Sequence, residues 1–471
     1  MGKFFGCIHS KGPDFMRSGI PIALLASAIA HAASAKDGGA PFKIHGQSWL
    51  DAGKVMASHD TLTNDGTGDF IDQEGVWLQT MGVQFTAVAD LSGNMEGAFG
   101  FGAHKATHSL GRFQGNTKVK YLAVSLFQNF ITQARLTYFQ GEKAAPWLSG
   151  TIGSFNYTYN RDSKNLGSYL LRGPVYPGLL MGGFQDFSAD SGKANVMGFQ
   201  LHHGAGSFSQ DLILKNEKDL PPTFDWSLAC VAKYKMSDAV EIGGGVNFYR
   251  LIPYNPKLET PGKLSVDGGR SYEIADTVTH DTVFFSHQGI KVMGMFSVEL
   301  NKFLGMGGLG PDDLKLYGEA AILGTRNYGT VYGKIGERMP VMLGFNLPAW
   351  GLVDFLSVEG EYYKSPYRND LANIGTLNNV ADWTLQNPAR PTPSPAPVGG
   401  AYPDSTRDNL KWSVNVEKTV AGHVKFLGQV ANDHYRPRPV ATGLTSSTGG
   451  TAETFTTPQD WYFMFRVGYF F

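Results

Sequence analysis

The sequence predicts an all-β fold, a transmembrane antiparallel β-barrel of about 16 strands within a range of about 14 to 18. Three observations support this fold class. Segments of about ten residues alternate between apolar and polar side chains, the pattern of a strand with one lipid-facing side and one water-facing side. The composition includes 59 Gly and 13% aromatic residues but only 17% charged residues. Apart from the N-terminal region, no run of about 18 apolar residues could cross a bilayer as a helix.

The N-terminal segment 1–35 has the layout of a secretory signal peptide. Basic residues precede the apolar run IPIALLASAIA, and the small residues Ala33–Ala35 offer a cleavage site. We expect the mature chain to begin at Lys36. Met1 and Met16 are alternative starts, and translation from either one would export the protein. A short buried helix is the competing interpretation of this segment.

The region 36–471 is expected to form a single barrel domain. Alternating segments recur along all of it, and an even strand number places both chain ends on one side of the membrane, as bacterial single-chain barrels require. The predicted strands cover 43–56, 74–91, 95–106, 119–139, 147–156, 194–203, 208–216, 224–234, 239–250, 282–300, 314–324, 338–347, 353–364, 409–419, 424–434 and 460–471.

The predicted connections are alternately short and long. Short ones such as AGH at 421–423 are expected at the periplasmic side, and long ones such as 251–281 and 365–408 are expected to be extracellular loops. The longest contains NPARPTPSPAPVGG, which cannot pair as an interior strand because proline lacks a backbone donor. An interdomain linker is the alternative for this segment.

The alternation also predicts which charged side chains face the lumen. In LKWSVNVEKTV, for example, Val414 and Val416 fall on one face, and Lys411 and Glu417 on the other. Because the inward charges have both signs, we expect a lumen that orients polar solutes without strongly selecting anions. The alternative is that these groups pair with each other and serve stability alone. The lumen-wall candidates are Arg135, Lys315, Glu319, Glu359, Glu361, Lys411, Glu417, Lys425 and Arg466.

The C-terminal segment WYFMFRVGYFF places apolar side chains at every odd position and ends on Phe471. It resembles the C-terminal strand that bacterial outer-membrane barrels present to their insertion machinery. The resemblance implies that Tyr469 and Phe471 belong to an insertion signal and that the last strand closes onto the first, KIHGQSWLDAGKV. It also implies an outer-membrane location, with lipid, lipopolysaccharide and the barrel-assembly machinery as partners.

The strand order is similar to that of general porins, whose barrels have about 16 strands and a loop that folds inward after the fifth. Here that connection is 157–193, in which tyrosines are interleaved with charged residues. No porin signature sequence accompanies it, so this likeness rests on strand order. A surface lobe packed by its own tyrosines is the alternative. The candidate constriction residues are Tyr157, Tyr159, Arg161, Asp162, Lys164, Tyr169 and Arg172.

These features predict a porin-like channel for passive diffusion of small hydrophilic solutes or ions. Within the same fold, a substrate-specific channel for sugars or oligosaccharides and a non-conducting structural or adhesin barrel are alternatives. A secreted, soluble all-β protein that binds carbohydrate is the alternative from another class. The resemblance to porins is compatible with a homotrimer, and no feature indicates nucleic acid as a partner.

No arrangement typical of an enzyme is found in the sequence. Ser154 and Ser168 lack the strand-turn-helix setting that activates a serine nucleophile. His202 and His203 are adjacent on a predicted strand, so their side chains point to opposite faces and cannot chelate one metal. Cys230 is the single cysteine of the expected mature chain and lies on the apolar face of its strand. We therefore expect no catalytic residue, no metal and no cofactor.

Overall fold

The structure, a computed structural model, describes residues 42–59, 61–64, 69–72, 74–114, 121–171, 194–217, 224–252, 271–275, 282–286, 289–305, 307–325, 334–364, 410–434, 455 and 457–471. The predicted signal peptide, its cleavage site and both alternative starts lie outside the described residues. The proline-rich segment lies outside them as well.

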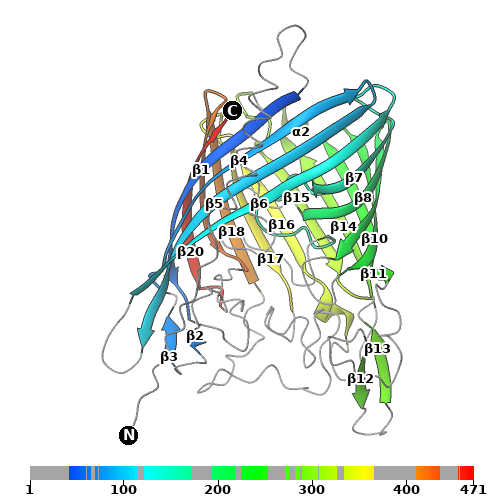
Figure 1. Cartoon of the computed structure of the whole chain (residues 1–471). Coiled ribbons are helices and arrows are strands. Elements are labelled where there is room, and N and C mark those ends of the chain that lie inside the picture. Colours follow the sequence, from blue (N-terminus) through cyan, green and yellow to red (C-terminus); the bar gives the residue numbers. More distant parts are fainter. Residues whose placement is uncertain are drawn as a thin grey trace, which may run out of the picture.

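Sixteen of the described strands form one closed antiparallel ring (Figure 1). Each strand pairs with the next in this ring and the last pairs back onto the first, which confirms the predicted barrel and its strand number. The ring contains β1 (Phe42–Ala57), β4 (Trp77–Ser92), β5 (Met95–Gln114), β6 (Tyr121–Gln140), β7 (Leu148–Tyr157), β8 (Ala194–Ala205), β9 (Phe208–Glu217), β10 (Asp225–Ser237), β11 (Val240–Ile252), β14 (Gly289–Glu299), β15 (Lys315–Ile322), β16 (Val341–Leu347), β17 (Phe355–Tyr362), β18 (Leu410–Val420), β19 (Val424–Asn432) and β20 (Trp461–Phe470).

The ring closes between β1 and β20, as the sequence predicts. Gly46 donates a backbone hydrogen bond of 2.8 Å to the Phe471 carbonyl, and the Phe471 N–H returns one of 2.9 Å. The Phe471 ring lies over Gly46, where a Cβ atom would come within 2.1 Å of it. The missing side chain of Gly46 thus leaves room for this ring at the seam.

The two faces of the ring differ in polarity because successive side chains of a strand point to opposite sides. On β20, Tyr462, Met464 and Arg466 are buried, whereas Phe465 and Tyr469 are exposed. A belt of exposed large apolar side chains therefore covers the outer face, which is the arrangement that hydrocarbon solvates. Its members include Leu50, Met81, Ile152, Leu201, Ile242, Leu343, Val358 and Phe465.

The connections gather in two sets at opposite ends of the ring. Short turns such as 421–423 lie at the end where β1 begins and β20 ends, at the top of Figure 1. The opposite end carries the longer connections, among them 158–193 between β7 and β8. In the ring, β7 is the fifth strand, so this connection has the position that the sequence predicts for it.

Four short strands lie outside the ring. The hairpin of β2 (Thr61–Asn64) and β3 (Asp69–Asp72) extends β5, and β12 (Ser271–Ala275) pairs with β13 (Thr282–Ser286) in a separate sheet. The prediction of one strand over 282–300 was therefore wrong in extent, since only β14 belongs to the ring. Two consecutive apolar segments give one continuous pattern because periodicity does not reveal where a strand changes its partner.

Helix is scarce in the described part of the chain. The short helix α2 (Leu300–Leu304) and the 3-10 turn η2 (Ile335–Arg338) both lie in connections between strands. Among the described residues, no helix is both long enough and apolar enough to cross a membrane.

Candidate functional site: the lumen and the segment 158–171

The barrel encloses a cavity of about 910 Å³. Pockets that hold small ligands measure roughly 300–1,000 Å³, so the space could admit a small solute. Its lining comes from the strands on both sides of the β1–β20 seam and from the segment 158–171, which follows β7. The charged side chains on it are six cations and two carboxylates: Arg135, Arg161, Lys164, Lys233, Lys425 and Arg466, with Asp211 and Glu417.

The segment 158–171 is held against the inner wall by carboxylates of β15 and β17. Glu359 accepts backbone N–H bonds from Lys164 at 2.5 Å and from Asn165 and Leu166 at 2.9 Å each. The Tyr317 hydroxyl donates a further bond of 2.9 Å to the same carboxylate. Backbone donors that no strand satisfies thus find a charged acceptor, which is stronger than a neutral one.

A second carboxylate, Glu319, binds the segment at Ser168 and Tyr169. Its oxygens accept the backbone N–H of Ser168 at 2.9 Å and that of Tyr169 at 2.8 Å, together with the Tyr159 hydroxyl. Ser168 has a φ of 63°, a left-handed conformation uncommon for a residue with a side chain. The hydrogen bond of its N–H to Glu319 helps to maintain that conformation.

Tyr169 connects the segment to a third carboxylate. Its hydroxyl donates a 2.7 Å bond to Glu361, whose other oxygen lies 2.7 Å from Nε2 of His434. Burial raises the pKa of the Tyr169 hydroxyl well above its ordinary value, so this group remains a protonated donor. Tyr169 and its neighbour Leu170 are fully buried, so this end of the segment fills space against the wall instead of bordering open lumen.

Strands further around the ring complete the attachment. Asn165 donates to Ser413 of β18 at 3.1 Å and to Asp433 at 2.8 Å. On the other side, Asn247 of β11 donates to the Leu170 carbonyl at 3.1 Å. The segment is therefore bonded to several strands of one side of the ring, from β11 to β18.

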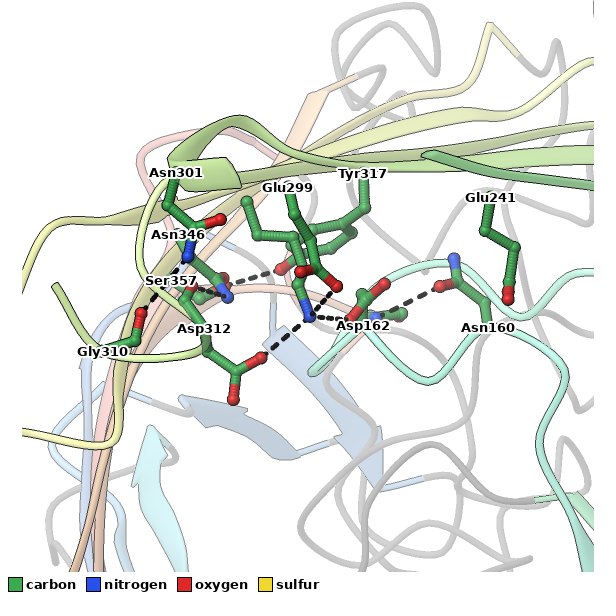
Figure 2. Close-up of polar contacts among 12 residues, drawn as sticks. Asn160, Asp162, Glu241, Glu299, Asn301, Gly310, Asp312, Tyr317, Asn346 and Ser357 are labelled. Atoms are coloured by element: carbon green, nitrogen blue, oxygen red, sulfur yellow. Dashed lines mark hydrogen bonds and ion pairs between the residues drawn. The ribbon is translucent and has the colours of Figure 1, made fainter. Parts of the chain in front are cut away.

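Lys315 of β15 links the segment to the short-turn end of the wall. Its ammonium lies 3.2 Å from Asp162, 2.9 Å from Asp312 and 3.8 Å from Glu299 (Figure 2). Figure 2 also shows Asp162 directed toward the wall strand that carries Tyr317, which is β15. The Lys315 ammonium lies between these three carboxylates and offsets part of their negative charge.

Four other wall cations also have carboxylate partners. Arg466 of β20 makes two contacts with Asp51 of β1, of 2.6 Å and 2.9 Å, across the seam. Arg135 lies 2.9 Å from Glu96. Two further pairs, each on neighbouring strands, are Lys425–Glu417 at 2.9 Å and Lys233–Glu241 at 3.9 Å.

The predicted constriction residues separate into two groups. Tyr157, Arg161 and Lys164 line the cavity. Tyr159 and Tyr169 are buried between the segment and the wall, and Asp162 pairs with Lys315. Arg172 lies outside the described residues.

The predicted lumen-wall residues all lie on the inner face, in two environments. Four of them line the cavity, and the other five are buried and do not border it. The lining residues are Arg135, Glu417, Lys425 and Arg466, and the other five are Lys315, Glu319, Glu359, Glu361 and Lys411. Tyr469 and Phe471, predicted as insertion-signal residues, are exposed at the end of β20.

Several residues important to this site are absent from the sequence-based candidates. Asp51 and Glu96 pair with predicted wall arginines, and Asp433 binds the segment. Asp51 has the same parity as the buried Trp49, so the alternation along β1 could have identified it. Asp433 lies just after β19 but within the predicted strand 424–434, where the alternation places it on the polar face with Lys425 and Gln429.

The chain matches no known family model and no curated protein sequence. Similar solved structures include a double mutant of the Rh. blastica porin, with 8% identity and a TM-score of 0.39. A triple mutant of the Rhodopseudomonas blastica porin has 8% identity and a TM-score of 0.40. Each alignment covers 91% of this chain and 100% of the other. The closed barrel of this chain follows from its own strand pairings.

Proposed function

We propose that this chain is a porin-like channel of the bacterial outer membrane through which small hydrophilic solutes diffuse. The observation that carries the proposal is the closed ring of sixteen strands, with an apolar belt outside and a polar, charged cavity of about 910 Å³ inside. A barrel of this kind has no free sheet edge and can satisfy its backbone within a bilayer. Passage requires no covalent step.

The segment 158–171 is the proposed constriction. It leaves the wall after the fifth strand of the ring and is bonded to wall carboxylates, and Arg161 and Lys164 extend from it to the cavity lining. The long connections are proposed to be extracellular, and the exposed Tyr469 and Phe471 to be read by the barrel-assembly machinery. Lipid and lipopolysaccharide would surround the belt, and a homotrimer is the proposed assembly.

Planar-bilayer recording of the purified full chain tests this function. We expect stepwise conductance that rises with salt concentration, and swelling of proteoliposomes that becomes slower from pentoses to trisaccharides. A barrel that inserts but passes no steady current would contradict a diffusion channel and would favour the non-conducting wall protein.

A sugar-specific channel is the second candidate, because aromatic side chains also line the cavity. Trp49, Phe155, Tyr157, Phe355 and Phe470 border it, and such rings can stack on sugar faces. A specific channel would be blocked by its own sugar. Inhibition of ion current by millimolar oligosaccharide would support this candidate, whereas an unchanged current would support general diffusion.

A further inference from the structure

We infer that this pore prefers anions, because the inward segment 158–171 covers the acidic part of the wall and leaves cations on the cavity lining. This inference rests on the proposed channel function and adds the charge of the solute class. The sequence predicts no strong selection of anions, because the inward-facing charges have both signs. The sequence alone does not show which of these charges a solute in the lumen would meet.

The acidic part of the wall consists of Glu319, Glu359 and Glu361. None of the three is more than 2% exposed, and none borders the cavity. Their oxygens accept hydrogen bonds from the segment, including four backbone N–H groups of 2.9 Å or less from Asn165, Leu166, Ser168 and Tyr169. A carboxylate occupied in this way interacts with the segment and is shielded from a solute in the lumen.

The cavity lining has the opposite balance. Among the described residues, it carries six Arg and Lys side chains but only Asp211 and Glu417 as carboxylates. Asp211 is further engaged, with Tyr157 and Gln200 each donating to it at 2.8 Å and His202 Nδ1 at 2.8 Å. The seam pair is also asymmetric, because Arg466 borders the cavity whereas Asp51 does not.

Arg161 is the lining cation that contributes most clearly to a positive charge in the lumen. It is an exposed residue of the segment and borders the cavity, and among the described residues no carboxylate lies within ion-pair distance of it. Lys164 of the same segment also borders the cavity, and its ammonium lies 4.4 Å from the ring centre of Phe355. Ion preference follows the charges that line a constriction.

The test is the reversal potential of the full chain in planar bilayers under a KCl gradient. One positive unit charge at about 4 to 8 Å in water raises the local concentration of chloride and lowers that of potassium by about two- to sixfold each, so we expect chloride to be about five- to thirtyfold more permeant than potassium. The double variant Arg161→Gln, Lys164→Gln should lose most of this preference, and Arg161→Glu should shift it toward potassium.

Lys418→Gln is the matched control, because this lysine lies on the other face of β18 from Lys411 and Glu417 and binds Asp354 at 3.8 Å and the Gly351 carbonyl at 2.9 Å near a short turn. It should leave the reversal potential unchanged. Heat-dependent gel migration verifies that each variant is folded.

The possible outcomes separate the two proposals. Absence of current in the natural chain contradicts the channel function itself. A current with equal or greater permeability to potassium leaves the channel function intact and overturns the anion preference. A preference that persists unchanged in both segment variants overturns the assignment to Arg161 and Lys164.

Discussion

Single carboxylates decide how the interior of this barrel is organised. Glu359 and Glu319 each accept several hydrogen bonds from the segment 158–171, and Glu361 accepts one from Tyr169. Asp51 instead binds Arg466 across the seam. A hydrogen bond to a charged group contributes about 1.5–3 kcal/mol, roughly twice a neutral one. Carboxylates therefore hold the segment 158–171 against the wall and also join β1 to β20 at the seam.

The seam pair gives a prediction at this scale. Asp51→Asn should lower the free energy of unfolding by about 3–5 kcal/mol, because removing one partner of a buried pair leaves the Arg466 charge uncompensated. Urea titration of the refolded protein in lipid, followed by heat-dependent gel migration, measures this loss.

Glu417→Gln provides the comparison for the seam variant. Its pair with Lys425 is partly exposed, and pairs of that kind contribute about 0–1 kcal/mol. If both variants lose stability equally, then burial at the seam does not determine the strength of the pair.

Strands and connections of this chain differ in how far the sequence predicts them. Each strand of the ring overlaps a predicted one, because alternation of side chains is a local property that a single strand shows by itself. The short strands β2, β3 and β12 were missed, since four or five residues contain too few alternations. The partners of the segment 158–171 lie on β11, β15, β17 and β18, and no local pattern encodes contacts between residues so distant in sequence.

The attachment of the segment gives a prediction at the scale of elements. Glu359→Gln replaces one acceptor oxygen by an amide that faces backbone N–H groups of Lys164, Asn165 or Leu166, so the segment should detach locally. Losing one or two charged hydrogen bonds corresponds to about 1.5–6 kcal/mol of attachment free energy. We expect single-channel current to become noisier and the segment to become sensitive to protease.

Glu417→Gln again serves as control, since Glu417 also lies on the inner face, on the neighbouring strand β18, but binds Lys425 and, among the described residues, no part of the segment. Quiet current and protease resistance in Glu359→Gln would show that Glu359 is dispensable for holding the segment in place.

At the scale of the molecule, the outer face of the barrel is suited to hydrocarbon and the inner face to water. Val83 and Gln84 are neighbours near the middle of β4, and they face opposite sides: Val83 belongs to the exposed apolar face and Gln84 lines the cavity. Identical substitutions at these two positions therefore meet different solvents. The sequence predicts this division for every strand, but it does not predict which polar residues become covered by an inward segment.

Arginine at these two positions tests the division directly. Val83→Arg should lower the free energy of unfolding in lipid vesicles by about 2–4 kcal/mol, because a cation near the bilayer midplane is destabilising by that amount. Gln84→Arg should fold almost normally because water solvates its guanidinium. The folded fraction after dilution from urea into vesicles measures both effects, and equal folding of the two variants would argue against a lipid-facing belt.

Cys230 lies exposed on the outer face of β10 and is the only cysteine among the described residues. Cys230 has no disulfide partner among the described residues, and its neighbours on β9 and β11 are fixed by the strand register. A thiol-reactive dye or spin label coupled to it would therefore point away from the lumen at one defined position along the barrel axis. Cys230 is thus a natural labelling site that reports the depth of β10 in the bilayer during membrane insertion, and labelling it changes no charge of the lumen.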